Sequence, residues 1–247
     1  MVMLLYLRTY IKIHMLKRFA SLLLLLLPTA LFAQEVEKGG DQPEKRKRMS
    51  KPSRDFVMLQ FTYEGWANKP DSVKTGGIGR GFNAYLCYDF PLKNSNFSFA
   101  AGVGIGTSNV YLDNQELSLY SATDSVARFL PETQSYKKYK LTTAYLEAPF
   151  ELRFFGNKMN RNKGFKAAVG FRAGTLIGAH TKGKLDNNVV YKTNTRNHLE
   201  NWRFATTARI GWGNFTLMGS YNLNKLFSEG EGPQITPYSL GICITGL

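Results

Sequence analysis

Hydrophobic and polar residues alternate along most of the chain beyond residue 56. In eight segments of eight to eleven residues, apolar side chains take every second position, and glycine, small or polar residues fill the others. A period of two indicates a β-strand, because successive side chains of a strand point to opposite faces. The pattern therefore predicts an all-β fold of eight strands. They span 57–64, 81–90, 97–106, 144–154, 165–174, 202–212, 215–223 and 238–245.

The connections between these segments alternate in length. Those at 93–96, 156–164 and 213–214 are short, and those at 67–78, 113–138, 183–200 and 224–234 are long. A water-soluble barrel shows the same alternation of side chains, but short turns at one end and long loops at the other are typical of outer-membrane barrels. Loop length therefore favours a membrane-spanning barrel over a soluble one.

Aromatic residues of the apolar face sort by height when odd strands run away from the N-terminal side and even strands return. One group falls at the short-turn end and another at the long-loop end, with Ala, Leu, Val and Ile mostly between them. The groups are Phe90, Phe97, Phe154, Phe165, Trp212, Phe215 and Tyr63, Phe82, Trp202, Phe204, Tyr221, Tyr238. Two aromatic girdles around an apolar band are expected in a bilayer. We therefore expect an eight-stranded, antiparallel, up-and-down transmembrane β-barrel over residues 55–247 that closes first strand to last, because hydrocarbon satisfies no backbone hydrogen bond.

The N-terminal region predicts an export signal. Lys17 and Arg18 precede an apolar run and a short break with small residues, so residues 1–33 form the predicted signal peptide, with Met15 as a possible true start. A membrane-anchor helix is the alternative, although the apolar run is short for spanning. Residues 34–54 are polar and charged and predict a disordered basic tether on the periplasmic side, where both termini of the barrel would lie.

The formal net charge of +14 does not indicate nucleic-acid binding. Part of the excess lies in the predicted signal peptide and tether, and the remainder is spread along strands and loops without a basic helix or an RNA-binding motif. Cys87 and Cys243 share the interior side of their strands with one strand between them, about 9 Å apart, which is beyond the reach of a disulfide.

Charged residues occupy the interior side of the predicted strands. An eight-stranded barrel has room inside only for side chains, so these charges must pair with one another. Counting from the 156–164 turn places Glu147 close to Arg172, with Arg209 at a similar height. We expect a structural polar network that fills the lumen, with a proton or ligand path as the alternative. Its members are Glu64, Glu147, Glu151, Arg153, Arg172, Arg203 and Arg209.

The candidates for chemistry are few. His180 and His198 lie at or near the third long loop, and Asp186 and Ser228 have no informative spacing to either. No phosphate-binding glycine loop and no metal-ligand spacing occurs. We therefore expect no catalytic residue, no cofactor and no metal, with a lipid-active enzyme that uses His180, or a narrow pore, as alternative hypotheses.

The segment Tyr145-Leu146-Glu147-Ala148-Pro149-Phe150 resembles the corresponding strand of PorT-like outer-membrane β-barrel proteins of the Bacteroidota, and the run from Gly164 to Lys182 is similar as well. The resemblance covers about residues 55–247. It implies an outer-membrane location and an eight-stranded barrel. The founding member is needed for export by a type IX secretion system, which makes a secretion accessory role the alternative function.

Taken together, the sequence predicts a non-enzymatic outer-membrane protein of a Gram-negative envelope, with a structural or interaction role carried by its outer loops. The partners that we expect are outer-membrane lipid, the barrel-insertion machinery during biogenesis, and envelope or secretion-system proteins. We expect no nucleic acid among them.

Overall fold

The computed structural model describes residues 55–119, 126–157 and 163–246. The predicted signal peptide 1–33, with its possible start at Met15, and the predicted tether 34–54 lie outside these residues. Within the described part of the chain, no helix is long and apolar enough to cross a membrane. The strands are β1 (Asp55–Ala67), β2 (Arg80–Pro91), β3 (Phe97–Leu112), β4 (Gln115–Ser118), β5 (Arg128–Pro131), β6 (Tyr136–Phe155), β7 (Phe165–Leu185), β8 (Val190–Asn194), β9 (Trp202–Trp212), β10 (Phe215–Asn222) and β11 (Thr236–Thr245).

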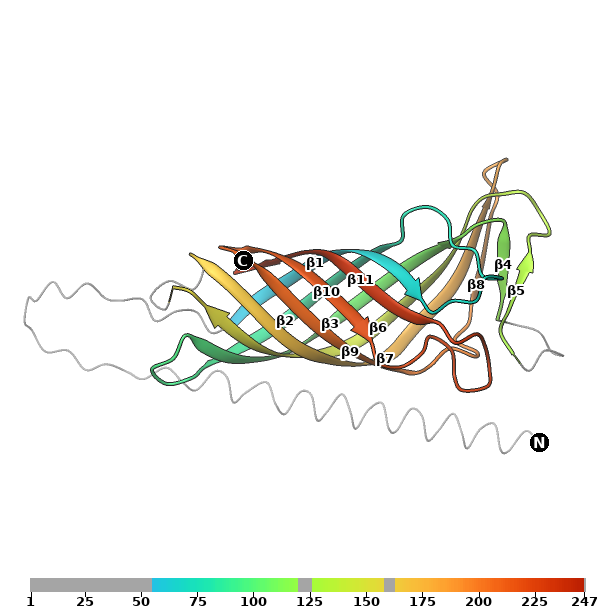
Figure 1. Cartoon of the computed structure of the whole chain (residues 1–247). Helices are drawn as coiled ribbons and strands as arrows, with labels where there is room; N and C mark the ends of the chain where they lie inside the picture. Colours follow the sequence, from blue (N-terminus) through green and yellow to red (C-terminus); the bar gives the residue numbers. More distant parts are fainter. Residues whose placement is uncertain (1–54, 120–125, 158–162, 247) are drawn as a thin grey trace, which may run out of the picture. The chain divides into compact units, whose positions relative to one another are not determined.

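Eight of these strands close into an antiparallel barrel (Figure 1). Their order around the wall is β6-β3-β2-β1-β11-β10-β9-β7, and the pairing of β6 with β7 completes the ring. Each strand lies beside its neighbours in the chain, and β1 pairs with β11 from Met58↔Thr245 to Ala67↔Thr236. The predicted eight-stranded, up-and-down barrel is confirmed.

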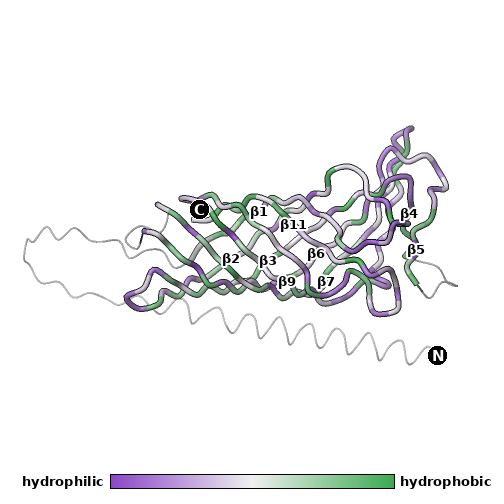
Figure 2. The backbone as a smooth tube through the Cα atoms, viewed as in Figure 1, coloured by the Kyte–Doolittle hydropathy of each residue, from purple (hydrophilic) through white to green (hydrophobic). Residues whose placement is uncertain are grey.

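The two ends of the barrel differ. At the short-turn end, residues 92–96, 156–164 and 213–214 join neighbouring strands, and at the long-loop end the connections carry β4, β5 and β8 (Figure 1). Figure 2 shows hydrophilic segments gathered at the long-loop end, around β4 and β5, whereas hydrophobic residues recur along the barrel wall.

The outward face of the barrel wall is apolar. Leu86 on β2 is 66% exposed and lies between Val57 on β1 and Val103 on β3. Phe97 and Phe154 meet at the short-turn end, with ring centroids 5.2 Å apart. A further aromatic pair, Phe61 and Phe82, lies toward the long-loop end with its centroids 5.2 Å apart, and Tyr63 follows at 6.4 Å from Tyr238. So continuous an apolar exterior is stable against lipid chains and not against water.

Two barrel strands are longer than the alternation predicted. β6 begins at Tyr136 rather than at residue 144, and β7 continues to Leu185 rather than ending at residue 174. A β-bulge changes the register from Tyr145↔Leu176 to Ala144↔Gly178, so Ile177 has no direct partner. A bulge shifts the side on which later residues point. The period-two pattern of β7 is therefore interrupted at Ile177, and the sequence pattern does not predict the part of the strand beyond it.

An arginine in the middle of the outward face tests this orientation. We expect Leu86→Arg to lower the free energy of unfolding by about 2–4 kcal/mol, because the guanidinium must enter the apolar core of the bilayer. Urea titration of the protein in lipid vesicles, followed by heat-modifiable gel migration, measures the change. The control is Val190→Arg, in an exposed side chain of β8 at the long-loop end. Equal losses in the two variants would contradict the orientation.

Candidate functional site

The barrel interior is filled by polar side chains in two clusters. Among the described residues, four acids and five bases are buried in strands of the barrel wall: Glu64, Asp89, Glu147, Glu151, Arg153, Lys166, Arg172, Arg203 and Arg209. This set includes all seven interior residues named from the sequence. Inward-facing alternate positions of the wall strands place them there, since each wall strand has one face inside.

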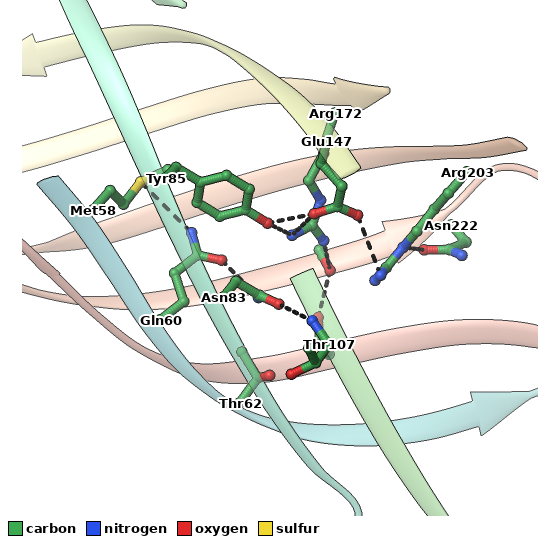
Figure 3. Close-up of polar contacts among 12 residues, drawn as sticks. Met58, Gln60, Thr62, Asn83, Tyr85, Thr107, Glu147, Arg172, Arg203 and Asn222 are labelled. Atoms are coloured by element: carbon green, nitrogen blue, oxygen red, sulfur yellow. Dashed lines mark hydrogen bonds and ion pairs between the residues drawn. The ribbon is translucent and has the colours of Figure 1, made fainter. Parts of the chain in front are cut away.

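The central cluster is built around Glu147 on β6 (Figure 3). Tyr85 Oη donates to Glu147 Oε2 at 2.5 Å, and Arg172 Nη1 lies 3.4 Å from the same oxygen. Arg172 Nη1 also donates to Tyr85 Oη at 2.6 Å. On the other side of the carboxylate, Arg203 Nη1 lies 3.3 Å from Glu147 Oε1. Glu147 therefore holds side chains from β2, β7 and β9 together across the lumen.

Hydrogen bonds extend the central cluster to β10 and β11. Arg172 Nη2 donates to Ser220 Oγ at 3.0 Å, and Ser220 in turn hydrogen-bonds Ser239 Oγ on β11 at 2.5 Å. Arg203 Nε donates to Asn222 Oδ1 at 3.4 Å. Arg172 is 1% exposed. A fully buried guanidinium requires such partners because an unpaired charge has a high desolvation cost.

Glycines on the inward side make the space that these groups occupy. A Cβ on Gly106 would lie 2.5 Å from Glu147 Oε2, and one on Gly174 would lie 2.7 Å from Glu147 Cγ. Gly81 makes room for Glu64 in the same way, because a Cβ on Gly81 would lie 2.3 Å from Glu64 Oε1. Thr62 Oγ1 donates to that oxygen at 2.5 Å. The glycines on the polar face of the sequence pattern thus accommodate the carboxylates.

The turn-side cluster lies nearer the short turns. Arg209 makes two hydrogen bonds to Glu151, Nε to Oε1 at 3.0 Å and Nη2 to Oε2 at 2.5 Å. Arg153 Nε donates to Glu151 Oε2 at 2.7 Å, and Arg153 Nη1 lies 3.7 Å from Asp89 Oδ1. Counting along the strands placed Arg209 level with Glu147, whereas the structure pairs it with Glu151.

A small sulfur-rich layer adjoins both clusters. Met58, Tyr85, Cys87, Met218 and Cys243 pack together. Arg209 Nη1 donates to Cys243 Sγ at 3.4 Å. The two cysteines have free thiols and fill space. The register sets Cys87 opposite Phe56 and Cys243 opposite Gln60, so they differ by four positions along the strand that separates them.

An apolar cap lies at the long-loop end. Inward residues of the wall strands, such as Trp66 and Leu141, join apolar residues of the loops. The cluster comprises Trp66, Val73, Val110, Leu112, Leu117, Leu119, Ala127, Leu141, Tyr145, Leu176, Ala179, Leu199, Leu226, Phe227 and Ile235, with Phe129 and Tyr139 against it. Arg203 lies under this cap, with its guanidinium 5.1 Å from the Tyr145 ring centroid. Sequence reasoning missed the cap, although apolar residues such as Leu117 and Phe227 in otherwise polar loops were a signal for it.

Among the residues that the structure describes, neither His180 nor His198 is hydrogen-bonded to a serine, threonine or cysteine side chain. His198 Nδ1 lies 3.2 Å from Glu231, and Ser228 contacts the His198 backbone through its own amide. Asp186 accepts from Ser135 Oγ at 3.2 Å. Burial and the nearby Lys192, Lys140 and Lys182 lower the pKa of His180. Within the described residues, no group of three or more His, Cys, Asp or Glu side chains could hold a metal ion.

Residues 47–228 match the family model described as outer membrane protein beta-barrel domain. The chain belongs to this family. It is therefore an outer-membrane β-barrel protein, as the apolar exterior and the closed sheet of this barrel also require. None of the curated proteins gives a significant match to the sequence.

Two solved structures are similar to this outer-membrane barrel. Both are of Ail, the attachment invasion locus protein of Yersinia pestis, one of them in complex with the heparin analogue sucrose octasulfate. That complex is 11% identical, covers 78% of this chain and 97% of Ail, and has a TM-score of 0.35. The other is 14% identical, covers 79% of this chain and 100% of Ail, and has a TM-score of 0.36.

Removing the shared carboxylate of the turn-side cluster tests its contribution to stability. We expect Glu151→Gln to lower the free energy of unfolding by about 3–5 kcal/mol, because Arg209 remains buried without its carboxylate partner and Arg153 loses the nearer of its two carboxylates. Urea titration in detergent micelles measures the change. Glu229→Gln, in an exposed loop residue, is the charge-matched control. A loss below about 1 kcal/mol for Glu151→Gln would show that the cluster does not stabilise the barrel.

Proposed function

We propose that this protein is a non-enzymatic outer-membrane barrel with a filled lumen, whose structured long-loop end faces the outside of the cell and serves interactions in the envelope. The observation that carries the proposal is the combination of a lumen occupied by paired charges and an apolar cap over its long-loop end. A barrel built in this way has little room for passage of a solute.

The cap also supports a display function for the loops. Phe129 of β5 contacts Trp66 of β1 and Phe227 of the last long loop, with ring centroids 6.0 and 6.1 Å apart. Residues far apart in sequence thus hold the loops in one arrangement. A rigid scaffold that presents ordered loops is a common basis for binding.

Placement of the short turns and both termini on the periplasmic side is part of this proposal. It follows the general organisation of outer-membrane barrels, in which short turns are periplasmic and long loops extracellular. A secretion accessory role remains the alternative. It rests on the PorT-like resemblance of the Tyr145 to Phe154 strand, and deletion that leaves all cargo export intact would exclude it.

The closed lumen makes a direct prediction for conductance. We expect the purified, heat-modifiable protein to be silent in planar bilayers, because Arg172, Tyr85 and Glu147 occupy the lumen at its centre. A porin inserted under the same buffer serves as the positive control. Reproducible conductance steps would replace the proposal with the narrow-pore hypothesis.

The display function predicts a loop-dependent interaction. We expect replacement of 115–131, which contains the β4–β5 hairpin, by a short Gly-Ser linker to keep heat-modifiable folding and to abolish protein crosslinks formed on intact outer membranes. An epitope inserted at the 187–188 turn is the control, and it should be accessible on intact cells in both proteins. Crosslinks unchanged by the replacement would place the interaction elsewhere, and an inaccessible epitope would reverse the orientation.

A further inference from the structure

A three-stranded flap continues the barrel wall beyond the long-loop end. It consists of residues 136–143 of β6, residues 178–185 of β7 and the whole of β8, which pairs with β7 from Lys184↔Val190 to His180↔Asn194. Its inner face is anchored. Tyr136 and Tyr139 pack over Gly183, where a Cβ would lie 2.5 Å from the Tyr136 ring. The two rings meet edge to face, with their centroids 5.2 Å apart.

The outer face of the flap carries a row of lysines. Lys182 on β7 lies directly opposite Lys140 on β6 and directly opposite Lys192 on β8. Two residues farther along the strands, on the same face, Lys184 lies opposite Lys138. Side chains directly opposite in an antiparallel sheet are close neighbours, about 4.5–5.5 Å apart at Cβ, and like charges there destabilise the sheet. Five lysines therefore share one face at a cost to the fold.

Nothing in the described residues neutralises this row. None of the five lysines has an ion pair with a carboxylate in that part of the chain. Lys140 Nζ donates to Asn109 Oδ1 at 2.6 Å and lies 6.0 Å from the Tyr111 ring centroid. Burial and the charge of Lys182 lower the pKa of Lys140. The face is therefore a site of unbalanced positive charge.

The position of the row indicates what would balance it. Lys140 and Thr142 alternate on the same side of β6 as Leu146 and Phe150, so the lysine face continues the lipid-facing surface of the barrel above the aromatic residues of the long-loop end. Figure 1 shows the flap, with β8, turning aside from the barrel axis at that end.

We propose that three directly paired lysines of the row, Lys140, Lys182 and Lys192, bind the phosphate groups of an anionic glycolipid in the outer leaflet around the barrel. In the cell, this inference rests on the proposed placement of the long-loop end outside. Charge complementarity favours an anion, and continuity with the lipid-facing wall favours one that is held in the bilayer over one in solution. Each lysine near an anionic membrane surface strengthens attachment by about 1 kcal/mol.

The test uses the full barrel in phosphatidylcholine nanodiscs that contain bisphosphorylated lipid A labelled with a quencher of tryptophan fluorescence. Trp212, which is exposed at the short-turn end, is replaced by phenylalanine in every protein, so that Trp202, exposed on the outward face toward the long-loop end, reports on lipid A close to the wall there. We expect Lys182→Gln/Lys192→Gln to weaken the association about 30-fold. We expect no change for Lys74→Gln/Lys93→Gln, which removes the same charge from exposed positions outside the flap. Heat-modifiable migration confirms that every variant is folded.

Two further arms separate lipid from soluble anions. Dephosphorylated lipid A should associate as weakly with the parent protein as phosphorylated lipid A does with the flap variant, and inorganic phosphate at the concentration of lipid phosphate should not displace the lipid. Equal association of the parent and the flap variant, or displacement by inorganic phosphate, would overturn the proposal. A nanodisc exposes both bilayer faces and holds no partner protein, so this result is independent of the orientation and of the interaction proposed for the loops.

Discussion

Closure of the backbone hydrogen-bond ladder is the constraint on which the rest of this structure depends. In hydrocarbon no water hydrogen-bonds to the backbone groups of an open sheet edge. The first strand, β1, must therefore pair with the last, β11, and β6 must pair with β7. The interior of an eight-stranded barrel is just wide enough to be filled by side chains. The polar lumen follows from that geometry, since the apolar residues are needed outside and the inward positions must still be filled.

A filled lumen then requires partners for every charge. Glu147 binds Arg172 and Arg203, and Glu151 binds Arg209 and Arg153, so each carboxylate is shared by two guanidiniums. Such a network links strands that do not pair with each other along the wall. It fixes the relative height of the strands through the interior, as the backbone ladder does through the wall.

The pattern of the wall strands inverts where lipid gives way to water. Inside the apolar band Leu86 and Val103 point outward, and beyond it Val110 and Leu141 point inward, into the cap. The sequence predicted the eight strands well because the same period-two alternation holds throughout the apolar band. It did not predict the extensions of β6 and β7, since the inversion coincides with the bulge at Ile177. Counting residues along the strands also placed Arg209 level with Glu147. Barrel strands are tilted, so residues at equal distances in sequence from the turns lie at different heights along the barrel axis.

The two faces of the flap illustrate the same division. Its inner face supplies the stability, because Tyr136 and Tyr139 pack over Gly183 while Leu141 and Ala179 join the cap. The fold places no comparable demand on the outer face, where neutral polar residues would avoid the repulsion between Lys182 and its two neighbours. A residue row that weakens a sheet and that the packing does not require is best explained by what it contacts outside the protein. With the long-loop end outside the cell, as proposed, the surroundings at that height are the headgroups of the outer leaflet.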